Sequence, residues 1–298
     1  MIKVVVSNNV GFAERERKMK RIITEQILLE YQEYLYEEEK AAATIKKYIC
    51  DLEKLAKYAG GKEITKRMMV AYKEYLREEK KYKLTSINSF LVAANRLFEY
   101  LEWYDLRIKT YRIQKEAFVP ENKNLSKKEY KRLVRMARQK GKKRLAMIIQ
   151  TVCATGIRIS ELQHITVESI KKGVADIYGK GKQRKVLLPK KLLKLLRRYI
   201  KEAGIQSGIV FCTKRGNAVD RSNVWKEMKA LGTDANVARE KIFPHNLRHL
   251  FAKTFYEIDR DMAKLADMLG HSSIETTRIY VMTTSEEHQR QLDLMGLV

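Results

Sequence analysis

The sequence predicts a mainly α-helical chain of two domains, with a small antiparallel β-hairpin in the second. Apolar residues recur every three or four positions over most of the 298 residues, which is the period of amphipathic helices. That period fails over residues 107–124, where Pro120 is one of only three prolines. The stretch from Gly173 to Leu188 instead alternates apolar and polar residues around a glycine-rich turn, the pattern of a hairpin.

The first domain is expected over residues 22–106, after a poorly ordered lead over residues 1–21. Its helices are predicted to open at residues that commonly cap helices, in order Thr24, Thr44, Thr65 and either Thr85 or Ser86. Amphipathic helices joined by short loops form a compact helical domain. Whether Met1 or Met19 is the true start stays open, because the first convincing helix follows Met19.

The second domain is expected over residues 125–285, after an interdomain linker at 107–124. Ser126 and Glu129 have the spacing of a capping box and mark its first helix. Further helices are predicted near residues 130–138, 145–154, 190–203 and 221–230, and a short strand at 209–211. The tail at 286–298 ends in apolar residues and needs a covering surface, either its own domain or a neighbouring protomer.

The charge balance points to a polyanionic partner. Lysine and arginine number 61 against 36 acidic residues, a formal net charge of +25. Such an excess favours nucleic acid through phosphate neutralisation and counterion release, although it does not choose DNA over RNA. The sequence has no uninterrupted apolar span and no signal peptide, which argues against a membrane partner. The scattered Cys50, Cys153 and Cys212 favour neither a disulfide framework nor a zinc site, and indicate a reducing cytoplasm.

Three C-terminal segments place residues suited to phosphate chemistry in order along the chain. His245 and Arg248 form a His-x-x-Arg pair behind Pro244, His271 follows a glycine, and Tyr280 comes nine residues later. A phenol can attack phosphorus if a cation neutralises the phosphate and an acid protonates the leaving oxygen. Arginine suits the first role because its planar fork binds two oxygens, and histidine or lysine suits the second. The combination is far more specific than any one member.

Two further segments carry matching residues. In the octet Thr155 to Leu162, a glycine break precedes Arg158, and Glu161 follows one turn later. The predicted hairpin has a basic tip that contains Lys180 and Lys182. Both lysines can hold DNA backbone, and a hairpin tip can also carry one of them to a scissile phosphate.

These segments together resemble the tyrosine recombinases, the integrase family that includes the Xer-type resolvases. The resemblance covers most of the chain and is densest over residues 155–161, 179–181 and 245–280. It implies a helical core-binding domain and a catalytic domain that clamp a DNA duplex between them. The segment Lys253 to Tyr256 departs from the Thr-His pair usual in Xer-type resolvases, which leaves the subgroup open.

The resemblance implies a reaction. Tyr280 would attack a DNA phosphodiester to give a 3′-phosphotyrosyl link and a free 5′ hydroxyl. Arg158 and Arg248 would bind the non-bridging oxygens and stabilise the transition state. His245 would assist proton movement, His271 would donate a hydrogen bond and Lys180 would act as the general acid.

The resemblance also implies supporting residues and partners. Glu161 would hold the catalytic side chains in position without binding the phosphate itself. Four residues are expected to contact DNA, namely Lys182, Arg184, Lys46 and Lys47. The expected partner is double-stranded DNA, bound by a homotetramer on synapsed duplexes that is a monomer when free, with an accessory directionality factor left open. Neither a metal nor another cofactor is expected, and the implied location is the bacterial cytoplasm, on the nucleoid.

Three alternatives remain at this stage. A type IB topoisomerase would use similar chemistry as a monomer. A non-catalytic DNA-binding protein would explain the charge and the domain order. An RNA-binding protein would explain the charge alone. The DNA target, and the choice among integration, excision, inversion and dimer resolution, cannot be read from the sequence.

Overall fold

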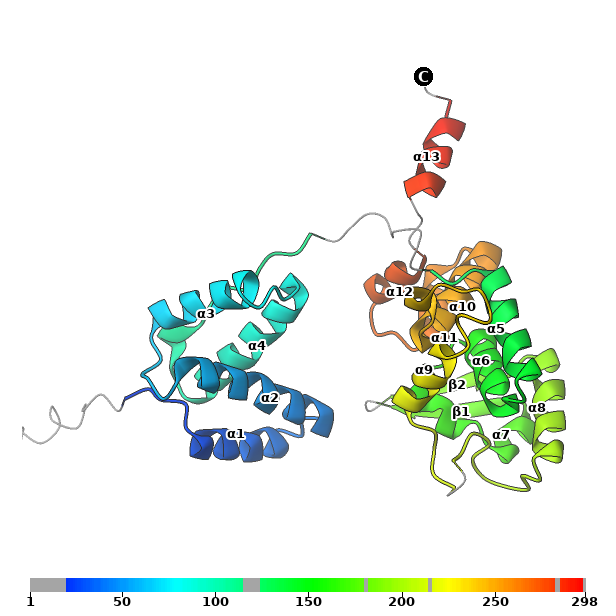
Figure 1. Cartoon of the computed structure of the whole chain (residues 1–298), viewed down its shortest axis with the longest axis horizontal. Helices are drawn as coiled ribbons and strands as arrows, with labels where there is room; N and C mark the ends of the chain where they lie inside the picture. Colours follow the sequence, from blue (N-terminus) through cyan, green and yellow to red (C-terminus); the bar gives the residue numbers. More distant parts are fainter. Residues whose placement is uncertain (1–19, 115–123, 180–181, 214–215, 282–284, 297–298) are drawn as a thin grey trace, which may run out of the picture. The chain divides into compact units, whose positions relative to one another are not determined.

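The computed structural model describes residues 20–114, 124–179, 182–213, 216–281 and 285–296. The chain divides into two compact units, with the division between Lys115 and Glu116 (Figure 1). Helices dominate both units, and the described residues contain one antiparallel pair of strands, in the second unit. The predicted fold class is therefore confirmed.

The first unit is a set of helices, namely α1 (Glu25–Glu37), α2 (Ala42–Ala59), α3 (Lys66–Glu78) and α4 (Leu84–Tyr100). Two of the predicted caps are confirmed, because the hydroxyls of Thr24 and Thr65 each accept a hydrogen bond from an amide three residues later, at 3.2 Å. Side-chain oxygens of this kind satisfy amides that a helix start leaves without a partner.

The other two predicted helix starts are wrong by a few residues. The helix α2 begins after Ala41 and α4 after Lys83, and neither start has a side-chain cap. Thr44, Thr85 and Ser86 lie inside the first turns of these helices instead. Both helices are amphipathic and pack through buried leucines, so packing sets their extent and a cap is dispensable.

The chain after α4 lies against the first unit. The side chain of Asn95 donates to the carbonyl of Ile108 and accepts from its amide, both at 2.8 Å. Asn88 makes the same two contacts with Tyr111, at 2.8 and 2.7 Å. Residues 108–111, within the stretch expected to be a linker, are thus held by two asparagines of α4.

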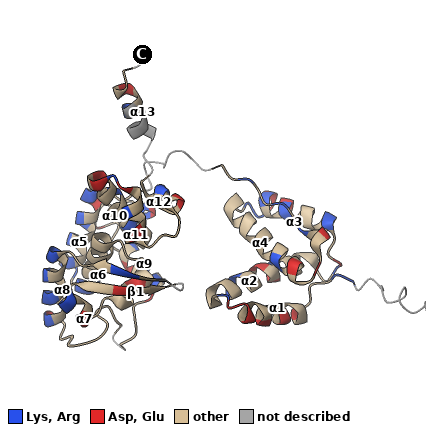
Figure 2. Ribbon diagram, turned by 180° about the vertical axis from the view of Figure 1, so that it is seen from behind, with Lys and Arg blue, Asp and Glu red and all other residues tan. Residues whose placement is uncertain are grey.

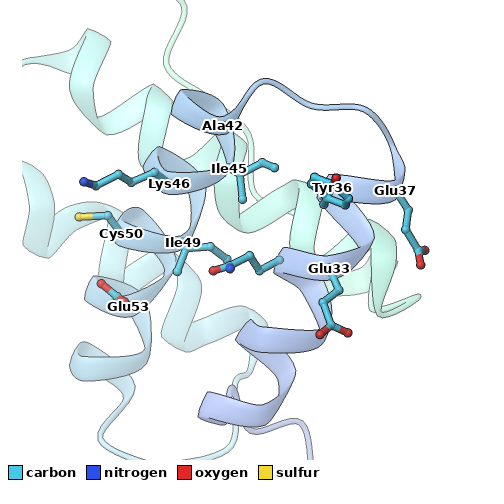
Figure 3. Close-up of a pocket in the computed structure, with 10 residues that line it drawn as sticks. Glu33, Tyr36, Glu37, Ala42, Ile45, Lys46, Ile49, Cys50 and Glu53 are labelled. Atoms are coloured by element: carbon cyan, nitrogen blue, oxygen red, sulfur yellow. The ribbon is translucent and has the colours of Figure 1, made fainter.

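A groove of about 810 Å³ lies between α1 and α2. Figure 3 shows Ile45 and Ile49 on the side of α2 nearest α1, with Lys46 and Cys50 pointing away from α1. Carboxylates and apolar side chains make up most of its lining, which contains neither arginine nor histidine. Such a lining does not suit a phosphate.

The second unit contains the helices α5 (Lys127–Gln139), α6 (Lys143–Thr155), α7 (Val167–Lys172), α8 (Lys190–Glu202), α9 (Arg221–Lys229), α10 (Pro244–Asp259), α11 (Met262–Leu269), α12 (Ile274–Val281) and α13 (Ser285–Leu294). The apolar α6 runs through the core, and α5, α8 and α10 pack around it (Figure 1). The predicted capping box is confirmed, since Ser126 and Glu129 exchange hydrogen bonds of 2.8 and 3.2 Å.

The predicted hairpin is also confirmed. Strand β1 (Val174–Gly179) pairs antiparallel with β2 (Lys182–Leu187), so that Gly179 faces Lys182 across the turn. Ala175 and Ile177 are buried on one face. The predicted strand at 209–211 is wrong, because among the described residues only isolated bridges form there, although Val210 and Phe211 are buried. The segment is apolar because it is buried in the core, and a short buried segment has the same sequence pattern as a strand.

Lysine and arginine positions recur along α8, where the ribbon is blue in Figure 2. Its buried side is formed by Leu192 and Leu196, whereas the lysines and arginines of the helix are exposed. In α13, Leu294 is 86% exposed, and the next residue, Met295, is 57% exposed. Across the described ranges, no helix combines the length and apolarity that crossing a membrane requires.

Candidate active site

The helix α10 carries three side chains of the candidate site, namely those of His245, Arg248 and His249. Pro244 occupies its first turn, where the missing amide proton costs nothing. His245 and His249 lie one turn apart and their rings meet edge to face, with centroids 4.9 Å apart. Arg248, between them in sequence, is only 1% exposed. A buried guanidinium needs acceptors, and their identity defines the site.

Helix ends supply the acceptors of Arg248. Its Nη1 donates to the carbonyl of Gly156 at 2.5 Å and its Nη2 to that of Leu269 at 2.7 Å. These carbonyls lie at the C-terminal ends of α6 and α11, where the helix dipole favours a cation. Burial, and then the charge of Arg158, lower the pKa of Arg248 to about 10, so it remains protonated at neutral pH.

Gly156 allows the chain to turn here. Its φ is +67°, and a Cβ on it would lie 2.4 Å from a ring carbon of Phe251. Only glycine fits both the backbone angle and the space. The turn leads into the short 3-10 helix η3 (Ile159–His164), and Arg158 is its N-cap residue.

Glu161 anchors Arg158. Its carboxylate accepts from the backbone amide of Arg158 at 2.7 Å and from Nη1 of the same residue at 2.9 Å. Arg184 of β2 adds two more hydrogen bonds, at 3.0 and 2.8 Å. Burial alone would raise the pKa of Glu161, but the bonds from Arg184 and from the Arg158 amide outweigh it and lower the pKa to about 2. Glu161 is therefore a permanent anion that holds two arginines.

Tyr280 of α12 lies among three histidine rings. Its ring stacks on that of His249, with centroids 4.2 Å apart and planes 23° from parallel. The rings of His245 and His271 lie 5.2 and 5.1 Å away, and the Cζ of Arg248 lies 5.8 Å from the Tyr280 centroid. The tyrosine is 9% exposed, so its ring is held tightly in place.

A hydrogen-bond chain fixes His271. Its Nε2 lies 2.8 Å from Nη2 of Arg248, and its Nδ1 lies 2.9 Å from the hydroxyl of the buried Thr277. An arginine only donates, so Nε2 is the acceptor and the neutral ring carries its proton on Nδ1. The Thr277 hydroxyl can accept from or donate to Nδ1, so it suits either tautomer.

The histidines are neutral at pH 7. Burial, together with the positive charge of Arg248, lowers the pKa of His271 to about 4. The pKa of His249 also falls to about 4, chiefly by burial and by the neighbouring His245. His245 is exposed, yet partial burial of its ring and the charges of Arg248 and Arg158 lower its pKa as well. Neutral rings can accept protons, which a base must do.

A pocket of about 550 Å³ opens beside these residues. Arg158, His245 and Arg248 line it together with Arg221 and Trp225 of α9. It thus presents cations and a neutral imidazole to the same space, an arrangement suited to an anion with tetrahedral oxygens.

The structure brings five of the predicted residues together, namely Arg158, His245, Arg248, His271 and Tyr280. Lys180 lies outside the described residues, and so does the side chain of Lys182. Glu161 accepts hydrogen bonds from both the side chain and the backbone amide of Arg158. Arg184, expected to contact DNA, pairs with Glu161.

Lys46 and Lys47 belong to the first unit. Lys46 is exposed, and Lys47 contacts both Asp51 and Ser89 at 2.5 Å.

Sequence reasoning missed His249, Thr277 and Arg221. His249 stands four residues after His245, so helical spacing alone could have placed both rings on one face of α10. Nothing in the sequence marks Thr277 or Arg221, because their relation to the site arises from the packing of α12 and α9.

Known proteins resemble this chain over most of its length. The tyrosine recombinase XerA of Pyrococcus furiosus is 29% identical over 287 aligned residues, which cover 93% of this chain and 96% of that protein. The structure of the XerH recombinase bound to a palindromic difH substrate has a TM-score of 0.72 at 20% identity, covering 92% of this chain and 90% of that one. A lambda integrase tetramer bound to a Holliday junction has a TM-score of 0.68 at 16% identity, with coverages of 86% and 76%.

Family comparison covers both units. The phage integrase N-terminal SAM-like domain matches residues 28–104. The phage integrase family itself matches residues 123–287, more than half of the chain. The chain therefore belongs to the phage integrase family of tyrosine recombinases.

Proposed function

We propose that the protein is a site-specific DNA recombinase that cuts and rejoins DNA strands through a 3′-phosphotyrosyl intermediate. The observation that carries the proposal is the packing of the Tyr280 ring among three histidines, beside the buried guanidinium of Arg248. A phenol, neutral bases and fixed cations are the components that transesterification at phosphorus requires.

Each residue receives a role from its surroundings. Tyr280 attacks phosphorus, and the neutral His245 takes up the phenolic proton. Arg158 and Arg248 bind the non-bridging oxygens. Their positions are fixed before the phosphate arrives, by Glu161 and by helix-end carbonyls respectively, so little reorganisation opposes the transition state.

His271 joins the reaction by changing its tautomer. In the structure its Nε2 accepts from Arg248. When a phosphate takes Arg248 as its partner, Nε2 can instead carry the ring proton and donate a hydrogen bond to a phosphate oxygen, while the Thr277 hydroxyl turns to donate a hydrogen bond to Nδ1. We assign the general acid to Lys180 on the hairpin, where it protonates the leaving 5′ oxygen.

The rejoining step reverses the first. The 5′ hydroxyl of a partner strand attacks the phosphotyrosine, which releases Tyr280 and restores a phosphodiester. The link conserves the energy of the broken bond, so the exchange needs no nucleotide cofactor. Four cuts on two duplexes call for four protomers, and the lambda integrase of similar fold is seen as a tetramer on a Holliday junction. The exposed Leu294 and Met295 are suited to docking on a neighbouring protomer.

Contacts with the DNA backbone follow from the basic surface. Lys46 and Lys182 are proposed contacts. Lys47 and Arg184 could reach a phosphate only by giving up the carboxylates that they already hold. A chain of net charge +25 that binds DNA in this way is expected on the nucleoid.

Covalent trapping tests the function. Nicked duplexes drawn from the DNA that flanks the gene are incubated with the wild-type protein and analysed under denaturing conditions. We expect a protein-DNA adduct that is lost in Tyr280→Phe, while that variant still binds DNA. Tyr256→Phe, which removes another phenol from the same unit, serves as the control and keeps the adduct. An adduct that persists in Tyr280→Phe would exclude this nucleophile.

A further inference from the structure

Arg184 is more buried than the residues on either side of it in β2. Its neighbours Gln183 and Lys185 are exposed, whereas the side chain of Arg184 is only 17% exposed. Its two terminal nitrogens each donate to a different oxygen of Glu161, at 3.0 and 2.8 Å. This two-pronged arrangement fixes both the position and the plane of the carboxylate.

The turn at Gly270 holds the stem of Arg184. Gly270 ends α11 with a φ of +66°, and a Cβ on it would lie 2.8 Å from Cδ of Arg184. The glycine therefore leaves room for the arginine stem to pass. Arg184, on β2, therefore contacts both η3, through Glu161, and the turn at Gly270 that precedes His271.

Glu161 transmits this constraint to Arg158. The same carboxylate oxygen that accepts from Arg184 Nη1 also accepts from Arg158 Nη1, at 2.9 Å. The other oxygen accepts from the Arg158 amide. Arg158 itself is 44% exposed on its side chain, so this carboxylate is its principal restraint in the described structure.

Stability alone does not account for the pair. Buried ion pairs are often no more stabilising than apolar side chains of similar size, because desolvation offsets the attraction. The Nε of Arg184 is also buried without a hydrogen-bond partner. An arrangement that leaves a donor unsatisfied to keep two others on one carboxylate is better explained by the need for a fixed geometry.

We propose that Arg184 is a positioning residue for strand cleavage, which acts through Glu161 to hold the Arg158 guanidinium at the site. The proposal rests on the recombinase function above. It assigns Arg184 to the interior of the site and removes it from the DNA-contacting surface.

The first test needs no DNA. Hydrogen exchange of the free full-length protein is compared for wild type, Arg184→Met and Lys185→Met. Lys185 is the matched control, since it adjoins Arg184 on β2 and also carries one positive charge. We expect faster exchange in residues 156–162 for Arg184→Met only, with global unfolding in urea still cooperative. Unchanged exchange there would overturn the proposal.

If Arg184→Met does not fold, Arg184→Lys replaces it. Lysine keeps the positive charge beside Glu161 but cannot bind both carboxylate oxygens in the plane of a guanidinium. Faster exchange in residues 156–162 is again expected, and unchanged exchange there would overturn the proposal.

The second test uses whichever DNA fragment the wild type traps. Arg184→Met should lower the single-turnover cleavage rate about 100-fold, the loss expected when a reacting group is misplaced by about 1 Å. DNA affinity should stay within about threefold of wild type. In an Arg158→Ala background, Arg184→Met should add little further loss, because its effect passes through Arg158.

Two results would overturn the positioning role. One is a further 100-fold loss in the Arg158→Ala background, which would make the two residues independent. The other is a loss of DNA affinity that accounts for the loss of rate, which would make Arg184 a DNA contact. If the wild type traps no fragment, the recombinase function fails, and the exchange comparison still decides whether Arg184 holds Arg158.

Discussion

At the scale of single residues, the site depends on how each charge is compensated. Arg248 is buried yet remains charged because helix-end carbonyls accept from it. Glu161 is buried yet remains charged because two arginines donate to it. His249 and His271 are instead neutral, because burial and then the neighbouring positive charge disfavour their protonated forms. One small region thus holds fixed cations and neutral bases side by side.

The neutral state of His249 predicts a pH dependence of stability. Its folded pKa is about 4, below the ordinary value of about 6.5. As pH falls from 7 to 5 the unfolded chain therefore binds a proton that the folded chain does not, and the free energy of unfolding decreases. His249→Phe, which keeps a ring stacked on Tyr280, should reduce that decrease by about 1–2 kcal/mol. Urea unfolding at the two pH values measures it. An equal decrease in both proteins would contradict the assignment.

At the scale of elements, turns between helices bring the site together. The C-terminal ends of α6 and α11 both point carbonyls at Arg248. Both helices end in a glycine with positive φ, and in both cases a side chain occupies the place of the absent Cβ. The ends of these helices therefore supply hydrogen-bond acceptors for Arg248 as well as boundaries of secondary structure.

Replacement of Gly156 tests this role. Gly156→Ala combines a strained φ with a clash against Phe251, whereas Gly141→Ala has a similar φ and nothing within 4 Å of the new Cβ. We expect a loss of about 1 kcal/mol for Gly141→Ala and about 3 kcal/mol for Gly156→Ala, measured by urea unfolding. The cleavage rate should fall only in Gly156→Ala, because the carbonyl that holds Arg248 moves. Equal losses of stability would show that the clash is relieved without cost.

At the scale of the whole molecule, the chain consists of two units, each with its own hydrophobic core. The first unit is helical, and the second contains the candidate site. The basic residues of the protein are spread along the whole chain, and several of them lie on α8 (Figure 2). A charge distributed in this way is suited to contact with many phosphates.

That distribution predicts a steep salt dependence of DNA binding. With six to ten phosphate contacts, affinity should fall by about 10³- to 10⁵-fold between 50 and 200 mM salt. Lys46→Ala should reduce the slope of log affinity against log salt by about 0.9, the value expected for one lost contact. Lys47→Ala is the matched control, since its ammonium already pairs with Asp51, and should change the slope less. Fluorescence anisotropy at several salt concentrations measures both slopes, and equal changes would refute the distinction.

The sequence by itself determined the fold class, the hairpin and five residues of the candidate site, namely Arg158, His245, Arg248, His271 and Tyr280. These features are local, because helical period, cap residues and ordered motifs depend on neighbours along the chain. The caps Thr24 and Thr65 were predictable because each capping bond joins a hydroxyl to an amide only three residues later. The strand expected at 209–211 was wrong because buried apolar residues look alike in a strand and in a packed loop.

Only the tertiary structure decided how the side chains are paired and which charges they carry. The Arg184 guanidinium reaches Glu161, 23 positions away in the sequence, and Arg248 reaches a carbonyl 92 positions away. The neutral state of His271 likewise comes from burial and from arginines on other elements. Burial and long-range contact arise only when separate segments pack together, so no local pattern in the sequence reports them.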